Sequence, residues 1–282
     1  MFPQQASEWR CACRGACPEP VERVSRPLRS VQRERTSAFT LLELLIVIGI
    51  IALLLVLIAP AFTTIKSAGD VTSAAYTVKG VLDTARTYAE ANNTYTWVGF
   101  YEEDVSQSST NPATAGIGRL VMSIVASKDG TMLYTIPLNS LWTLDGLAPN
   151  PITLIQVGKL IKIDNLHLKT FPAATATPPP DTFDTRPVAT STDQIGDVTP
   201  PNPYLAFHYP VNVLPAQYTF TKVVQFSPRG EGVIDNSNYT LATVAEVGVE
   251  PTHGATVPAS IPANVVAVQF TGIGGNVRIY RR

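Results

Sequence analysis

Residue types that carry out catalysis are few and scattered in this sequence of 282 residues. The three histidines, His167, His208 and His253, have no serine or cysteine nucleophile motif near them in the sequence. No pair of carboxylates has a recognisable catalytic spacing either. General acid–base and nucleophilic catalysis both need such groups brought together in a defined geometry. The sequence therefore predicts no catalytic residues, and we expect the chain not to be an enzyme.

The three cysteines and the glycine cluster also lack the context of a cofactor site. Cys11, Cys13 and Cys17 have no second cysteine pair and no histidine nearby, whereas a structural zinc site needs four ligands. The glycines of residues 272–275 are followed by a strand pattern and not by a helix whose N-terminus would meet a phosphate. They are typical of a turn with positive φ. We expect no metal and no cofactor.

Basic residues gather at the C-terminus. Arg278, Arg281 and Arg282 lie beside Tyr280, and basic residues mixed with aromatics suit a single nucleic-acid strand. The whole chain has a formal net charge of −1, which excludes a strongly basic protein whose entire surface binds nucleic acid. The three arginines are thus a weak candidate DNA contact, and the alternative is a solvated last strand.

The most unusual charged residue is Glu43, which interrupts a long apolar segment. Residues 44–59 contain no polar side chain, and the apolar stretch from Phe39 to Phe62 is long enough for one membrane crossing. Residues 1–38 carry a net charge of +3 and the remainder −4, so the positive-inside rule predicts a cytoplasmic N-terminus and a body outside the inner membrane. A carboxylate in such a segment either has a functional partner or reaches the lipid headgroups.

The residues around Glu43 resemble a known processing signal. Ala38-Phe39-Thr40-Leu41-Leu42-Glu43 is similar to the class III signal of type IV pilins and type II secretion pseudopilins. The resemblance implies that a prepilin peptidase cuts between Ala38 and Phe39 and methylates the new amine. It implies that Glu43 pairs with the Phe39 amine of a neighbouring subunit, and that Pro60 kinks the helix. The family normally has Gly where this chain has Ala38.

Residues 1–38 would then be a cytoplasmic leader, which is long for this family. We hypothesise that translation begins near Val31, which would leave a short basic leader.

Beyond Pro60 the apolar residues form a stripe instead of a continuous run. Residues 63–93 are expected to be an amphipathic helix that ends near Asn92-Asn93, because small and apolar residues recur every three or four positions. The stripe consists of Ala68, Val71, Ala75, Val78, Leu82, Ala85 and Ala89. Its many alanines favour close packing against a sheet over a free coiled coil.

Residues 94–282 are expected to form a β-rich exported domain. Strand patterns occupy 95–101, 119–127, 131–138 and 152–163, and resume from residue 218. Lys128-Asp129-Gly130 predicts a hairpin between the second and third of these strands. The Pro-rich residues 172–215 are interpreted as a long surface insertion. The acidic residues in it match no calcium loop; they are Asp181, Asp184, Asp193 and Asp197.

Three short motifs resemble the GspH/FimT minor pseudopilins: Ala85-Arg86 with Ala89, Phe226-Ser227-Pro228-Arg229-Gly230, and residues 271–278. The predicted fold class is therefore α+β and pilin-like. It has a long N-terminal helix, one half spanning the membrane and the other amphipathic, packed on a C-terminal antiparallel sheet or sandwich.

The expected function is that of a structural minor subunit of a type II secretion pseudopilus, anchored by a single pass in the inner membrane. Its expected partners are the prepilin peptidase, other pseudopilins or pilins, and membrane lipid. Two alternatives stay open. One is a minor type IV pilin for adhesion or DNA uptake, and the other is a membrane-anchored binding protein that does not polymerise.

Overall fold

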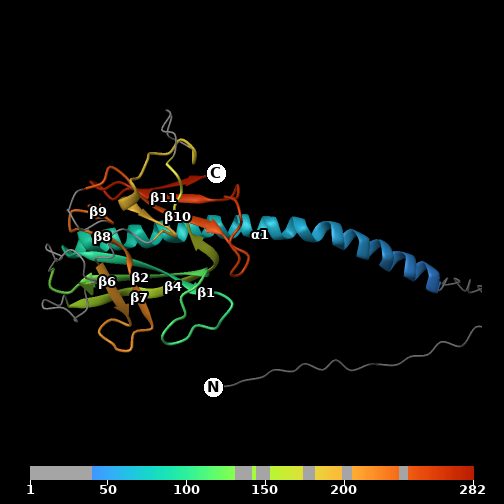
Figure 1. Ribbon diagram of the computed structural model, residues 1–282, viewed down its shortest axis with the longest axis horizontal. Helices are drawn as coiled ribbons and strands as arrows, with labels where there is room; N and C mark the ends of the chain where they lie inside the picture. Colours follow the sequence, from blue (N-terminus) through green and yellow to red (C-terminus); the bar gives the residue numbers. More distant parts are fainter. Residues whose placement is uncertain (1–39, 131–141, 144–152, 174–181, 199–204, 235–240) are drawn as a thin grey trace, which may run out of the picture. The chain divides into compact units, whose positions relative to one another are not determined.

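The computed structural model describes residues 40–130, 142–143, 153–173, 182–198, 205–234 and 241–282. For residues 56–70 it describes the helical backbone but not the side chains. The chain divides into two compact units, Met1–Ala52 and Leu53–Arg282. In its described part the first unit holds Thr40 and the opening turns of helix α1. The second holds the rest of α1 and every described strand (Figure 1).

Helix α1 runs over Leu41–Asn92, 52 residues. It ends where the sequence predicts, because Asn93 adopts the left-handed region with φ 49° and the Thr94 N–H donates to the Ala89 carbonyl at 3.0 Å. The charged residues of its second half form two pairs one turn apart, Lys79 with Asp83 at 2.8 Å and Arg86 with Glu90 at 3.0 Å.

The apolar stripe of the second half is buried, while the side chain of Ala68 lies outside the described ones. The buried stripe residues are Val71, Ala75, Val78, Leu82, Ala85 and Ala89. They form one core with residues from eight strands of the larger sheet. The alanines bring the helix backbone close to this sheet, as a stripe of small residues predicts.

The strands form two sheets. The larger, nine-stranded sheet contains β1 (Thr96–Asp104), β2 (Gly118–Ser127), β4 (Leu154–Leu168), β5 (Gln194–Ile195), β8 (Lys222–Phe226), β9 (Gly232–Val233), β10 (Ala245–Pro251), β11 (Val266–Phe270) and β12 (Val277–Arg281). Its order is β12-β11-β10-β4-β2-β1-β8-β9, all antiparallel, with β5 added parallel to β10. The smaller sheet contains β3 (Trp142–Thr143), β6 (Leu205–Tyr209) and β7 (Tyr218–Phe220). A 3-10 turn, η1, covers Ser191–Asp193.

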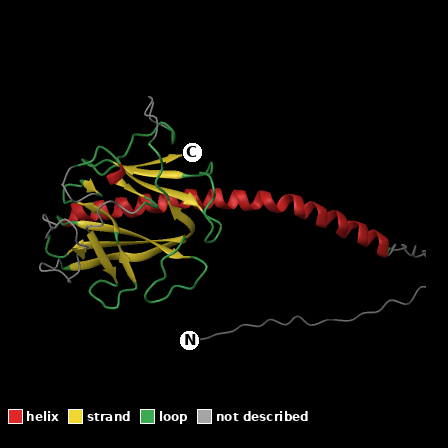
Figure 2. Ribbon diagram, in the orientation of Figure 1, coloured by secondary structure: helices red, strands yellow, loops and turns green. Residues whose placement is uncertain are grey.

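The larger sheet curves around the second half of α1. The smaller sheet covers part of the face of the larger sheet that points away from α1 (Figure 2). Strand β1 shows why both faces are filled. Its Trp97 points into the core under the smaller sheet, while Val98 and Phe100 point into the core with α1. Gly99 faces the smaller sheet, where an added Cβ would lie 2.5 Å from the Cβ of Phe220. Glycine at this position lets the two sheets pack closely.

Two local predictions are wrong. Strand β2 pairs along its length with β1 on one side and with β4 on the other, so neither edge is open for the hairpin expected after Lys128-Asp129-Gly130. The partner strand of that hairpin, 131–138, lies outside the described residues. The Pro-rich segment 172–215 is more than a surface insertion, because its described parts supply β5 and β6 and the buried Phe183 and Arg186.

The expected fold class also needs correction. No helix among the residues that the structure describes is long and apolar enough to cross a membrane. The pilin-like fold with a membrane-spanning half is therefore wrong as predicted. The single-pass location in the inner membrane, the transmembrane segment and the placement of the body outside that membrane lose their basis with it.

Candidate assembly site

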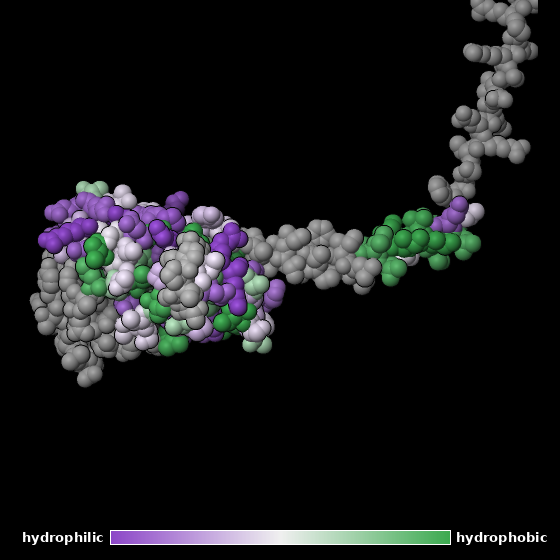
Figure 3. All heavy atoms as spheres, turned by 90° about the horizontal axis from the view of Figure 1, so that it is seen from above, coloured by the Kyte–Doolittle hydropathy of each residue, from purple (hydrophilic) through white to green (hydrophobic). Residues whose placement is uncertain are grey.

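The start of α1 is apolar on every side and exposed. In Figure 3 the described side chains of this segment form a continuous hydrophobic surface. Most globular proteins expose no apolar patch of this kind unless something binds it. The exposed residues are Leu41, Leu42, Leu44, Leu45, Ile46, Val47, Ile48, Ile50, Ile51, Leu53, Leu54 and Leu55. We call residues 41–55 the apolar segment.

Glu43, at the beginning of the apolar segment, belongs to a helix cap. The backbone N–H of Thr40 donates to Glu43 Oε2 at 3.0 Å, and the Thr40 hydroxyl donates to the same oxygen at 3.2 Å. In return the N–H of Glu43 donates to Thr40 Oγ1 at 3.2 Å. Thr40 and Glu43 thus form a capping box, which satisfies backbone donors that the first turn leaves without partners. The sequence contains this T-x-x-E signal, but the resemblance to pilins accounts for Glu43 only as a partner for another subunit.

The other residues of the predicted processing signal are only partly described. Ala38 and Phe39 lie outside the described residues, so the cleavage and methylation site stays a prediction. Pro60 lies within α1, whose backbone continues through it. The kink expected there stays a prediction as well, because the side chains of residues 56–70 are not among those described.

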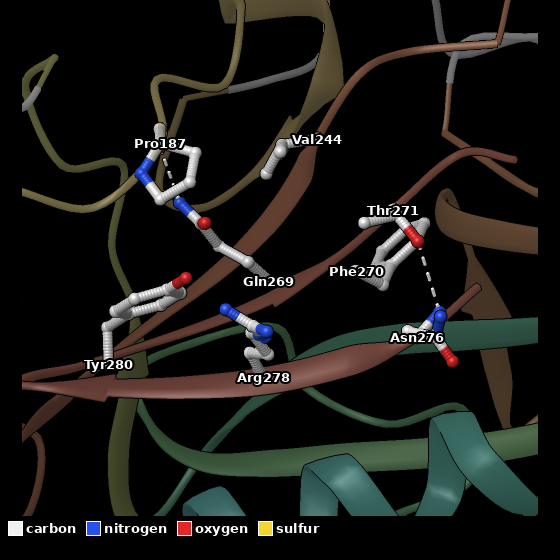
Figure 4. A pocket seen from close by; sticks show the side chains of 8 residues that line it. All are labelled: Pro187, Val244, Gln269, Phe270, Thr271, Asn276, Arg278 and Tyr280. Carbon is white, nitrogen blue, oxygen red and sulfur yellow. Dashed lines mark hydrogen bonds between the residues drawn. The ribbon is translucent and has the colours of Figure 1, made fainter. Parts of the chain in front are cut away.

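The three C-terminal arginines do not lie together. Arg281 points toward α1, where its Nη2 donates to Thr72 Oγ1 at 2.8 Å. Arg282 lies 3.7 Å from Asp184 of the Pro-rich segment. Arg278 lines a pocket with Tyr280 on the opposite face of β12 from Arg281 (Figure 4). The clustering that the sequence suggested is therefore divided between two faces of a strand.

The histidines likewise do not converge. His167 is buried and its Nδ1 lies 2.6 Å from Glu102 Oε1. His253 closes a short turn with Thr256 through backbone hydrogen bonds of 3.1 and 3.2 Å. Within the described part of the chain, no three side chains of the metal-binding types come close enough to hold a metal ion.

A group of buried and half-buried titratable side chains on β1, β4, β8 and β10 was not expected from the sequence. Besides His167, Glu102 accepts a hydrogen bond from the Leu168 N–H at 3.0 Å and lies 3.7 Å from Lys222 Nζ. Burial lowers the pKa of Lys222, although Glu102 partly opposes that shift. Glu250 is nearly fully buried, one of its oxygens has no hydrogen-bond partner among the described residues, and burial raises its pKa.

In the neighbouring pair of Lys169 and Asp197, the pKa of the carboxyl group is lowered, whereas that of Glu250 is raised. Their side chains meet at 2.7 Å, and Asp197 also accepts a hydrogen bond from the Thr170 N–H at 2.9 Å. Burial raises the pKa of Asp197, but these hydrogen bonds and the charge of Lys169 outweigh it and lower that pKa to about 2. Lys169 directly follows β4, and Asp197 lies two residues after β5 in the Pro-rich segment. The pair therefore connects the Pro-rich segment to the end of β4.

A second buried network holds the Pro-rich segment against the sheet. Arg186 donates to both carboxylate oxygens of Glu246, at 2.7 and 3.1 Å, and its guanidinium lies 4.4 Å from the ring centre of Phe183. Gln269 donates to the same carboxylate at 2.7 Å and to the Pro187 carbonyl at 2.8 Å. A bidentate pair of this kind fixes the geometry of both partners. No local signal could have predicted it, because Arg186 and Glu246 lie 60 positions apart.

No family model, no curated protein and no solved structure matches this chain.

Proposed function

We propose that this chain is a structural subunit of a filament of the pseudopilin type, and that the apolar segment of α1 is its assembly surface. One observation carries the proposal: twelve large apolar side chains are exposed around the first fifteen residues of α1. An apolar surface on all sides of a helix is stable in water only when other apolar surface covers it. In the proposed filament, the same segment of neighbouring subunits supplies that cover.

The capping box gives the proposal a defined starting point. It holds the Glu43 carboxylate at the first turn of the helix, three residues from Thr40. If the peptidase cuts before Phe39, as the resemblance implies, the new amine is only one residue from Thr40. A neighbour's amine that meets Glu43 would neutralise both charges within the apolar interface and set the axial register of the subunit.

The remaining structure suits a support for this segment. The second half of α1 is packed into the sheet core. The helix that carries the apolar segment is therefore held by the folded domain. The proposed partners are other pseudopilins or pilins and the prepilin peptidase. Division of the three arginines between two faces adds no support for DNA uptake.

The experiment compares one substitution at two exposed isoleucines. Ile48 is 57% exposed in the apolar segment, and Ile273 is 77% exposed in the turn between β11 and β12. Tagged wild type, Ile48→Asp and Ile273→Asp are expressed in the native host, and the tagged protein is measured in sheared, sedimented filaments. We expect Ile48→Asp to be lost from the filaments at least tenfold relative to Ile273→Asp. Equal incorporation of the two variants, or no wild-type protein in filaments, would contradict the proposal.

A further inference from the structure

The hairpin of β11 and β12 carries a small pocket on the face that points away from α1. Its volume is about 180 Å³. Gln269 on β11 lies directly opposite Arg278 on β12, so their side chains project side by side from one face. Tyr280 is two residues further along the same face of β12, and Pro187 of the Pro-rich segment closes one side. Figure 4 shows these four side chains around a common space.

The floor of the pocket has a fixed hydrogen-bond acceptor. Gln269 is 3% exposed, and its Oε1 has no hydrogen-bond partner among the described residues. The orientation of its amide is determined because Nε2 donates to both Pro187 and Glu246. Two acceptors therefore hold the nitrogen in place, and Oε1 is a buried atom of a side chain that lines the pocket, so a ligand donor reaches it only by a small shift of the pocket floor. A buried acceptor without a partner is unfavourable, so a donor from a bound molecule would relieve that cost.

The rim of the pocket has a cation. Arg278 is exposed, and its guanidinium forms no hydrogen bond or ion pair with any other described side chain. Apolar surface comes from Val244, Pro187 and Phe270. Within this one pocket, Arg278 offers donors for an anion and Gln269 offers an acceptor for one N–H or O–H group, beside a small apolar wall.

We propose that this pocket binds the free C-terminus of a peptide that ends in a small apolar residue. The terminal carboxylate would accept hydrogen bonds from Arg278, the amide N–H of the last residue would donate to Gln269 Oε1, and the side chain would contact Val244 and Pro187. The carboxylate and the N–H of a terminal residue are attached to the same Cα, which matches two side chains that are direct neighbours across a strand pair. Capture of a C-terminal carboxylate is a known mode of peptide recognition.

The size and charge of the site favour a peptide end over a nucleic acid. At about 180 Å³ the pocket is smaller than the roughly 300–1,000 Å³ of sites for drug-sized ligands, so only the end of a ligand enters. Nucleic-acid affinity depends on several cations that neutralise several phosphates, whereas Arg281 points away toward Thr72. A phosphodiester also has no hydrogen to donate to Gln269.

The test uses the full chain, held in solution with a mild detergent, and three acetylated Gly-Ala-Val peptides. The first has a free C-terminal carboxylate, the second a C-terminal amide, and the third a free carboxylate with an N-methyl group on the valine nitrogen. Binding is measured by calorimetry. We expect the first peptide to bind at least tenfold more tightly than either of the others, because one loses the anion and the other loses the donor to Gln269.

Two protein variants separate the pocket from general charge. Arg278→Gln should weaken binding of the free-carboxylate peptide at least tenfold. Arg281→Gln is the matched control, because it removes the same charge from the opposite face of β12 and should leave the affinity unchanged. The proposal is overturned by any of four results: no binding at about 10 mM peptide, equal binding of acid and amide, equal effects of the two variants, or tighter binding of an oligothymidine that Arg278→Gln abolishes.

Discussion

The two halves of α1 have the same secondary structure and opposite surroundings. In residues 41–55 nearly every side chain is large, apolar and exposed, whereas in residues 71–92 a stripe of small and medium residues is buried beneath the sheet. The first half contains no stripe because its apolar residues point in all directions. A helix with such a surface has no single apolar face that it can bury against its own domain. The pattern of apolar residues, and not their number, therefore decides whether a helix stabilises its own fold or is left for another molecule.

The largest expected effect comes from one substitution made in both halves. Leu82 is fully buried and Leu54 is 49% exposed. Leu82→Ala should lower the free energy of unfolding by about 2–5 kcal/mol, because it removes buried apolar surface and leaves a cavity. Leu54→Ala should change it by less than about 0.5 kcal/mol. Urea unfolding followed by tryptophan fluorescence, to which the buried Trp97 contributes, measures both.

If Leu54→Ala proved as destabilising as Leu82→Ala, the first half of α1 would be packed in the isolated chain, and the contrast between the halves would be wrong. Leu53→Ala, at 63% exposure, serves as a second exposed variant and should behave like Leu54→Ala.

The next prediction separates the two roles of Glu43. Glu43→Gln keeps a capping box, because glutamine at this position accepts the same hydrogen bond, but it removes the charge. Glu43→Ala removes both. We expect Glu43→Ala to destabilise the first turns of α1 by about 0.5–2 kcal/mol, which lowers helix content measured by circular dichroism, and Glu43→Gln to retain most of it.

Filament incorporation should rank these variants differently. If Glu43 pairs with a neighbour's amine, Glu43→Gln and Glu43→Ala should both reduce incorporation several-fold. If the cap alone matters, Glu43→Gln should assemble like the wild type, and the register role would be refuted.

How much could be predicted from the sequence differs between local and distant features. The buried stripe of α1, the end of the helix at Asn93, and the turn at Gly275 with φ 58° follow from spacing and residue type within a few positions. The network of Arg186, Glu246 and Gln269 could not be predicted, because residues far apart in the sequence meet only in the folded chain. The hairpin expected after Lys128 failed for the same reason, since its turn signal is local and β4 competes successfully for the edge of β2.

The assembly site shows the same limit in another form. The sequence identifies Glu43 as unusual because of its apolar neighbours. The resemblance to pseudopilins implies only a partner in another subunit and does not include the local cap. The cap with Thr40 depends only on residues three positions apart and was available as a sequence signal. The pocket beside Gln269 had no such signal, because its acceptor is identified only by the two hydrogen bonds that the nitrogen of the same amide donates.

The titration of Asp197 should change the stability of the domain half of the molecule. The pKa of Asp197 is lowered to about 2 in the folded chain, so its contribution is complete at neutral pH and is lost as pH falls from about 4 toward 2. Asp197→Asn should therefore cost about 1 kcal/mol or less at pH 7, as expected for a partly solvated pair, and nothing near pH 2.

Glu250 should show the reverse sign. Because burial raises its pKa, its charge opposes folding at pH 7, and the contribution of its protonated form is complete only below its ordinary pKa. Glu250→Gln should raise the unfolding midpoint at pH 7 and lose that advantage as pH falls. Neither variant should change the helix content of the apolar segment, and a change there would mean that the two halves of α1 are energetically coupled.

A small effect is expected at two glycines of α1, Gly49 and Gly80. An added Cβ at Gly80 or at Gly49 meets nothing within 4 Å, so alanine fits at both without strain. Alanine favours a helix over glycine by about 0.8–1 kcal/mol. Gly80→Ala should raise the melting temperature of the domain by about 2–4 °C, because residues around it unfold together with the sheet. Gly49→Ala should increase helix content but leave that melting temperature unchanged, because the large side chains around it are exposed. Equal shifts from both variants would show that α1 unfolds as one unit, and they would remove the energetic distinction between an assembly surface and a packed helix on which the proposed function depends.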